Sequence, residues 1–134
     1  MRADLVVRNG DETLVVVEAK AHPVDNDFRS AVMEQIRDYA VATRARWAIL
    51  ADPEAVQVYH VDDFERPVAS FPTEELRKGS LPTPMGEHTV LLAVENWLRR
   101  LSVNGDVVQA KPQLKPLAAS LANADQYSLE YGLD

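Results

Sequence analysis

The stretch Leu14-Val15-Val16-Val17-Glu18-Ala19-Lys20 decides how the rest of the chain is interpreted. Four consecutive apolar residues, three of them β-branched, predict a buried strand. Side chains alternate between the two faces of a strand, so Glu18 and Lys20 share one face and Ala19 lies on the other. Because charges at the end of a buried strand lose hydration, they must neutralise each other or hold something charged.

A plain structural explanation of these two charges is also open. Many apolar strands end in solvent with a weak exposed ion pair, and a motif of three residues has little specificity alone. The surrounding sequence has to decide between such an ion pair and a functional site.

The composition is that of one ordinary globular domain. The chain has 134 residues, of which 46% are hydrophobic and 26% are charged. No apolar run approaches the roughly 20 residues that span a bilayer, and the N-terminal residues include no apolar signal region. The absence of cysteine excludes disulfides and Cys-based zinc sites and fits a reducing compartment. We therefore expect a cytoplasmic protein with no membrane partner.

A β-hairpin is predicted at the start of the chain. Residues 4–8 read as a short strand, and turn-forming residues separate them from the strand that contains Glu18. A three-residue loop at 10–12 would place Asp4 opposite Glu18, because the loop length sets the register of the pair. The hairpin therefore predicts two carboxylates beside Lys20.

A helix and a second hairpin are predicted next. Apolar spacing indicates a helix over 28–43 that follows Asp and Asn residues suited to its N-cap. Gln35 and Tyr39 lie one turn apart on it and share a side. Strands are predicted at 46–51 and 55–61, around a Pro-containing turn. The residues expected to face the sheet from the helix are Phe28, Val32, Ile36, Tyr39 and Thr43.

The second half of the chain predicts shorter elements around one long helix. Helical patterns occur at 73–77, 87–101 and 117–124, the second with Val90, Val94, Trp97 and Leu101 as its apolar stripe. Tyr127, Leu129, Tyr131 and Leu133 then alternate as in a strand. We expect a single domain over 1–104 and a C-terminal extension over 105–134 that packs on the domain or on a partner chain.

The order of these polar residues resembles a known family. With Asp4, Glu18-x-Lys20 and Gln35-x-x-x-Tyr39 in hairpin-then-helix order, residues 3–61 resemble the PD-(D/E)XK nuclease superfamily. The resemblance is closest to the N-terminal nuclease domains of type I restriction enzyme motor subunits and to the RecB-like nucleases. It implies an α/β fold of restriction-endonuclease-like type, a mixed sheet flanked by helices. It also implies a nuclease that uses Mg²⁺ or Mn²⁺ to hydrolyse DNA, in restriction or repair.

The resemblance also implies a role for each polar residue. Asp4, Glu18 and the backbone carbonyl of Ala19 would hold the metal, and oxygen ligands are those that Mg²⁺ prefers. Lys20 would assist the attacking water or stabilise developing negative charge. Gln35 and Tyr39 would bind and position the DNA.

The sequence departs from the family pattern before Asp4. Ala3 stands where the family usually has proline, and the family core starts with a helix, often carrying a Glu of the metal site, and a first strand. Compared with that core, the chain reads as N-terminally shortened. We expect the helix with Glu87 and Glu95, or the alternating residues of the tail, to take the place of that family helix or first strand, in the same chain or in a dimer mate.

Two other interpretations stay open. A nuclease-like module could bind nucleic acid or protein without cutting, and a plain α/β scaffold could only oligomerise. The net charge of −7 disfavours nucleic acid unless positive charge gathers locally. We expect a homodimer, with DNA as the partner. The basic residues available for a DNA surface are Lys20, Arg29, Arg37, Arg44 and Arg46, which could equally be solvated side chains.

Overall fold

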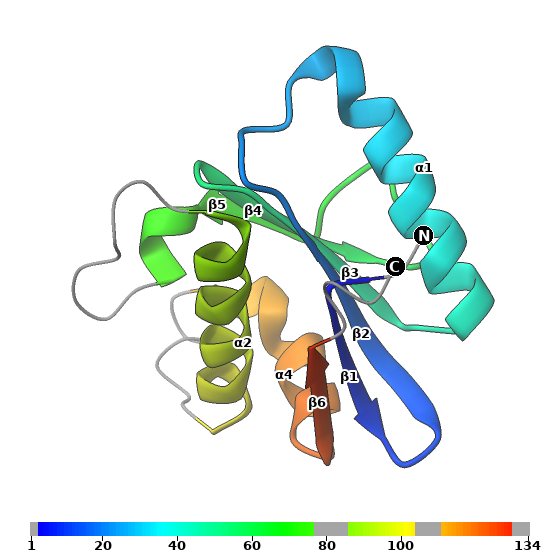
Figure 1. Cartoon of the computed structure of the whole chain (residues 1–134). Helices are drawn as coiled ribbons and strands as arrows, with labels where there is room; N and C mark the ends of the chain where they lie inside the picture. The colour runs from blue at the N-terminus through cyan, green and yellow to red at the C-terminus, as the bar shows by residue number, and fades with distance from the viewer. Residues whose placement is uncertain (1–2, 77–85, 104–110, 130–134) are drawn as a thin grey trace.

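The computed structural model describes residues 3–76, 86–103 and 111–129, which form one six-stranded sheet with helices on both faces (Figure 1). The strands are β1 (Leu5–Asn9), β2 (Glu12–Ala19), β3 (Trp47–Ala51), β4 (Ala55–His60), β5 (Ala69–Pro72) and β6 (Gln126–Leu129). The helices are α1 (Asn26–Thr43), α2 (Glu87–Val103) and α4 (Lys115–Leu121), with 3₁₀ turns η1 (Thr73–Leu76) and η2 (Pro112–Leu114).

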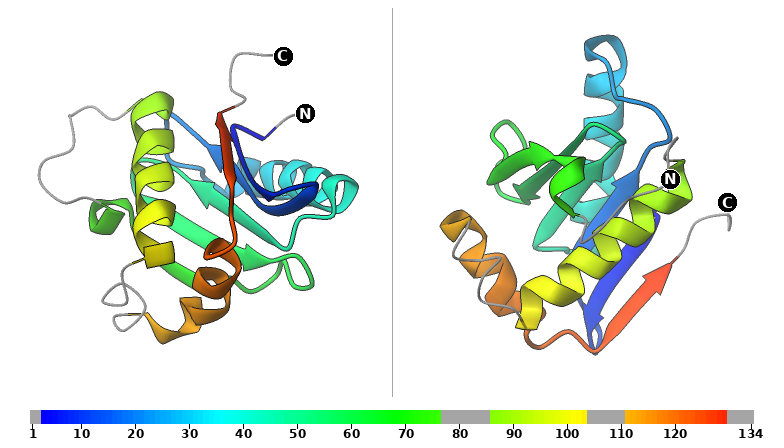
Figure 2. Two further views of the ribbon diagram at one scale, coloured as in Figure 1. Left: turned by 90° about the horizontal axis from the view of Figure 1, so that it is seen from below. Right: turned by 90° about the vertical axis from the view of Figure 1, so that its left-hand side faces the viewer.

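The sheet is mixed, in the order β5-β4-β3-β2-β1-β6. β2 and β3 run parallel, joined by α1 as a crossover, and the other four neighbouring pairs are antiparallel. β6 lies along the outer edge of β1, although the two strands come from opposite ends of the described chain (Figure 2). The site-bearing strands β1 and β2 are therefore interior strands.

The β1–β2 hairpin has the predicted register at its open end but not the predicted turn. Leu5 pairs with Val17, and the same register extended by one residue places Asp4 opposite Glu18. At the other end the turn has two residues, and Gly10 supplies a positive φ of 58° that suits glycine. A bulge beside Val7 restores the register. The three-residue loop was thus wrong, because the extra residue sits in the strand and not in the turn.

Apolar side chains form a separate core on each face of the sheet. The smaller core lies under α1 and includes Val6, Val16 and Ile36. The larger core lies under α2 and α4, and the predicted α2 stripe of Val90, Val94, Trp97 and Leu101 is buried in it. Figure 1 shows α1 on one side of the sheet and α2 with α4 on the other. Val16, and with it Glu18 two residues on, belongs to the α1 face.

The predicted face of α1 needs one correction. Asp25 caps the helix as expected, accepting hydrogen bonds from the backbone N–H groups of Asp27 and Phe28. Phe28, however, is 66% exposed. It lies in the first turn of α1, beyond the small core under the helix, where Ile36 and Ala40 are the buried positions.

Residues 111–129 pack on the sheet of the same chain. Leu117 and Leu121 of α4 join the larger core, and β6 extends the sheet. The Asp125 carboxylate accepts hydrogen bonds from the Gly10 N–H at 3.0 and 3.1 Å, which fixes β6 to the hairpin turn. Tyr131 and Leu133, the last two alternating positions, lie outside the described residues. None of the helices in the described ranges combines the length and apolarity needed to cross a membrane.

Candidate functional site

Glu18 and Lys20 lie at the end of β2 as an ion pair in a buried position. Glu18 is 6% exposed, and its Oε1 lies 2.9 Å from the Lys20 Nζ. The other oxygen, Oε2, is buried and has no hydrogen-bond partner among the residues that the structure describes. The Lys20 N–H donates to the Ala51 carbonyl at 2.8 Å, so the strand end is held beside β3. The weak exposed ion pair is therefore not what occurs here.

Asp4 lies beside them, immediately before β1. Its N–H donates to the Val17 carbonyl at 2.8 Å, and its Oδ2 accepts from the Ala19 N–H at the same distance. Asp4 is 8% exposed. The hairpin thus brings together the two predicted acids, while the Ala19 side chain points into the opposite core and only its backbone faces the site.

A third carboxylate comes from α2. Glu87 is in the first turn of that helix and is exposed, and its charge is close enough to act on both Asp4 and Glu18. Glu95, two turns further along α2, instead contacts Arg99 at 3.4 Å. Of the two glutamates expected to take the place of the family glutamate, Glu87 therefore lies at the site and Glu95 does not.

Burial and neighbouring carboxylates raise the pKa of both Asp4 and Glu18. Burial raises the pKa of Glu18 to about 7, the charge of Asp4 acts in the same direction, and Lys20 opposes both. Burial also raises the pKa of Asp4, with Glu87 adding to the rise and the Ala19 N–H opposing it. The site is therefore short of positive charge, although Lys20 is part of it.

The donor set fits a hard divalent cation. It consists of carboxylates and a backbone carbonyl, and the Glu18 Oε2 atom accepts no hydrogen bond from the part of the chain that the structure describes. Among residues 3–76, 86–103 and 111–129, no group of three His, Cys, Asp or Glu side chains is arranged so that it could hold a metal ion as it stands. Mg²⁺ keeps several waters and needs only one or two carboxylates, so the set present matches its chemistry.

Gln35 and Tyr39 share a side of α1, as predicted. Gln35 is exposed and Tyr39 is half-buried, and with Asp38 and Ala42 they line a shallow hollow of about 380 Å³. None of the three catalytic candidates of the β1–β2 hairpin lines this hollow. A role for Gln35 and Tyr39 in binding DNA stays a prediction.

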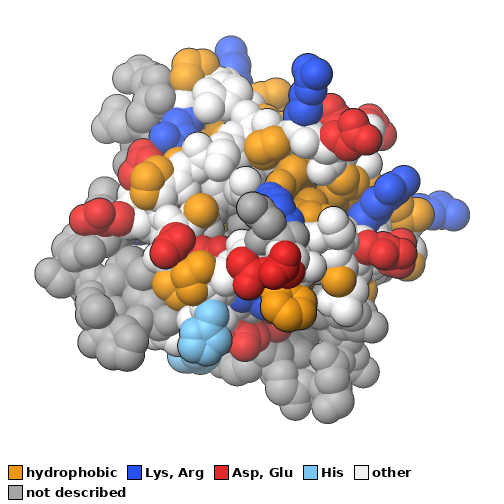
Figure 3. Space-filling view, turned by 90° about the horizontal axis from the view of Figure 1, so that it is seen from above, with side chains coloured by type: hydrophobic (Ala, Val, Ile, Leu, Met, Phe, Trp, Pro, Cys, Tyr) orange, Lys and Arg blue, Asp and Glu red, His pale blue; other side chains and the backbone are white. Residues whose placement is uncertain are grey.

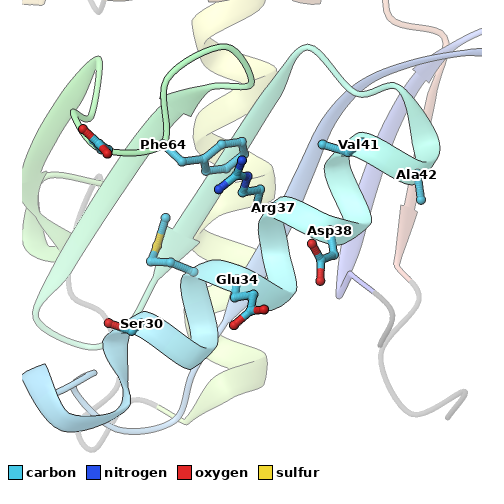
Figure 4. Close-up of a pocket in the computed structure, with 9 residues that line it drawn as sticks. Ser30, Glu34, Arg37, Asp38, Val41, Ala42 and Phe64 are labelled. Carbon is cyan, nitrogen blue, oxygen red and sulfur yellow. The ribbon is translucent and has the colours of Figure 1, made fainter.

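A second hollow, of about 680 Å³, lies on the other flank of α1. It is bounded by Arg37, Glu34 and Val41 of the helix and by Phe64, which reaches toward the helix from the β4–β5 connection (Figure 4). It contains none of the residues at the end of β2. We therefore separate it from the candidate site.

The predicted basic residues do not form one surface. Arg46 pairs with Glu12 near the hairpin turn, and Arg44 ends α1 in a left-handed conformation. Lys20 and Arg29, by contrast, lie near the strand end and the start of α1. Figure 3 looks onto this end of the molecule and shows acidic side chains near its centre, with basic ones beside them.

Sequence analysis missed two polar partners of Arg29 on β4. Arg29 Nη2 donates to the Tyr59 hydroxyl at 2.7 Å and also to Gln57 Oε1. Gln57 and Tyr59 are two apart in a strand, so they share a face. The alternation of polar and apolar residues along 55–60 was the signal that could have identified them.

Comparisons of the chain with protein-family models, with curated proteins and with solved structures gave no match.

Proposed function

We propose that the protein is a nuclease of PD-(D/E)XK type that uses Mg²⁺ or Mn²⁺ to hydrolyse phosphodiester bonds of DNA. One observation carries the proposal: buried Asp4 and Glu18 meet at the open end of one hairpin, with the Lys20 ammonium 2.9 Å from one Glu18 oxygen and no hydrogen-bond partner for the other within the described ranges. Burying two ionised acids and one amine leaves an excess of negative charge, which either a proton or a bound cation would offset.

The order of the sheet supports a restriction-endonuclease-like arrangement. β6 pairs with the free edge of β1, and α2 covers the face opposite α1. A strand beside the Asp-bearing strand and a helix with a glutamate are also parts of the core that the resemblance implies. We infer that the chain supplies both from its C-terminal half, with Glu87 as the helix glutamate.

Each residue then has a chemical task. Asp4, Glu18 and the Ala19 carbonyl would hold the cation, and Glu87 would add a further oxygen directly or through water. The bound ion would polarise the phosphate and lower the pKa of a water. Lys20 can donate a hydrogen bond to a phosphate oxygen or to the attacking water, and its positive charge stabilises the negative charge that develops during attack. Glu18 must lose its proton to serve as a ligand.

A nuclease-like module that binds without cutting is the second candidate. The net charge of −7 and the use of an Asp4 oxygen by the Ala19 N–H favour it. Such a module would keep the hairpin geometry as a structural feature and would not depend on Lys20 for its function.

A cleavage assay separates the two candidates. The full chain is incubated with plasmid and with single-stranded DNA in Mg²⁺ or Mn²⁺, beside Lys20→Ala and beside Lys115→Ala, which removes an exposed lysine of α4. A nuclease loses its metal-dependent cleavage in Lys20→Ala and keeps it in Lys115→Ala. No cleavage by the unmodified chain would favour the binding module, and equal cleavage by all three proteins would contradict the assignment of the active site to Lys20.

A further inference from the structure

Arg29 is a cation held between α1 and the sheet. It lies in the first turn of α1 and is half-buried, and its Nη2 donates to the Tyr59 hydroxyl and to Gln57 Oε1. Tyr59 is 2% exposed, and its hydroxyl also donates to Gln57 at 3.3 Å. The guanidinium therefore has a defined position set by two side chains of β4.

The charge of Arg29 is not neutralised by these contacts. Gln57 and Tyr59 are neutral acceptors, and Arg29 forms no ion pair with any residue in the described ranges. Both bonds use one nitrogen, whereas a guanidinium has five N–H donors in a planar fork. A half-buried cation without a counter-ion is unfavourable, so the position suits an anion that comes from outside the chain.

Arg29 also lies on the same face as the candidate site. The sheet register places Glu18 beside Leu50 and Leu50 beside Gln57, so Glu18 and Gln57 are two strands apart in one row. Neighbouring strands are spaced by about 4.8 Å, which puts the two residues about 10 Å apart. Leu50 between them is 3% exposed and carries no competing charge.

We propose that Arg29 binds a phosphate group of the substrate strand one or two nucleotides from the bond that is cleaved. The inference rests on the proposed function for its ligand, since a strand with one phosphate at Glu18 and Lys20 would have its next phosphates at about the distance that separates Glu18 from Gln57 and its partner Arg29. Arg29 acts as a binding residue that sets the position of the strand, and Tyr59 and Gln57 keep its guanidinium in place.

The test measures binding separately from cleavage. A labelled single-stranded oligonucleotide is titrated with the full chain in the presence of a chelator, so that no metal-dependent cleavage occurs. Arg29→Gln is compared with Arg37→Gln, which makes the same charge change on the same helix but in the hollow beside Phe64. We expect Arg29→Gln to weaken binding about tenfold and to reduce the slope of log affinity against log salt concentration by about one, as for the loss of one phosphate contact. Both effects should be smaller in Arg37→Gln.

A second measurement identifies the phosphate. Single phosphates of the oligonucleotide are replaced in turn by uncharged methylphosphonates. We expect one replacement to weaken binding by the unmodified chain about as much as Arg29→Gln does, and to have no further effect on that variant. Arg29→Lys restores a positive charge and is expected to recover most of the affinity and the sensitivity to that phosphate.

Three results would overturn the proposal: equal effects of the Arg29 and Arg37 variants, a methylphosphonate penalty that persists in Arg29→Gln, or no recovery in Arg29→Lys. The thermal midpoint of each variant reports whether it folds, and Arg29→Lys with the methylphosphonate series decides the question if Arg29→Gln does not fold. If the unmodified chain binds the strand through Arg29 but does not cleave it with Mg²⁺, the nuclease proposal fails, and the contact between Arg29 and a phosphate stands without a position relative to a cleaved bond.

Discussion

The two ends of the β1–β2 hairpin differ in the exposure of their charged side chains. At the turn, Asp125 accepts both of its hydrogen bonds from the Gly10 N–H, and Glu12 pairs with Arg46, all on exposed side chains. At the open end, Asp4 and Glu18 are buried, and one Glu18 oxygen has no partner among the described residues.

The charges at the turn therefore stabilise the folded state, whereas those at the open end destabilise it. The exposed contacts at the turn stabilise the closure of the hairpin and the docking of β6. Burial raises the pKa of both acids at the open end, and their ionised forms destabilise the folded chain. Groups that are retained at a cost to stability mark the end of the hairpin where function is to be sought.

The largest expected difference between the two ends is in catalysis. Asp4→Asn or Glu18→Gln should reduce metal-dependent cleavage at least about 100-fold, because each removes an anionic oxygen ligand from the site. Asp125→Asn makes the same kind of change at the turn and should leave the rate within about twofold. Initial rates on one DNA substrate with all three variants would check this, and a comparable loss in Asp125→Asn would erase the distinction.

The next difference is in stability against pH. The pKa of Glu18 is raised from 4.5 to about 7, so the folded state holds its proton more tightly than the unfolded state. Stability should therefore fall as the pH rises from about 4.5 to about 7, and the full penalty, of about 3 kcal/mol, should be present above that range. Glu18→Gln removes the penalty and should be more stable than the unmodified chain at pH 8 but not at pH 4.5. Urea unfolding at the two pH values measures the free energy of unfolding of both proteins. Identical pH profiles would contradict the conclusion that burial raises the pKa of Glu18.

Added metal should act on the open end alone. A cation bound to the ionised carboxylates stabilises the folded state by about 1.4 kcal/mol when its concentration is ten times its dissociation constant. The rise in thermal midpoint with Mg²⁺ should be clear at pH 8, weaker at pH 5 where Glu18 is protonated, and absent in Glu18→Gln. A rise of equal size in that variant would place the metal elsewhere.

The smallest effect is expected at the turn. Asp125→Ala leaves the Gly10 N–H to water and should lower the free energy of unfolding by about 1 kcal/mol, because the site is exposed. Chemical denaturation checks the size of the loss, and no loss would mean that β6 docks without this contact.

Short-range patterns predicted most of the elements. The β-branched run around Val16, the apolar stripe of α2 and the polar spacing of Glu18 and Lys20 each depend on neighbours within one or two turns or strand repeats. They predicted the hairpin, both long helices and the pairing of the two acids. The restriction-endonuclease-like type of the fold and the activity stay predictions.

The errors came from contacts that such patterns do not contain. The turn was misplaced because a bulge at Val7 and a shorter loop give the same register at Asp4. Phe28 was expected to be buried because spacing alone does not show where the underlying core ends. The role of Glu87 depends on how α2 is docked, so the sequence offered it only as one of two glutamates. The Arg29 contacts required the position of β4 under α1.

The pairing of Leu5 with Leu129 joins the first described strand to the last. β1 therefore keeps an open backbone edge during synthesis until β6 has left the ribosome, and contacts of such long sequence separation form slowly. α2, which brings Glu87, emerges well after the hairpin that it completes. We expect chains truncated before β6 to be prone to aggregate through that edge.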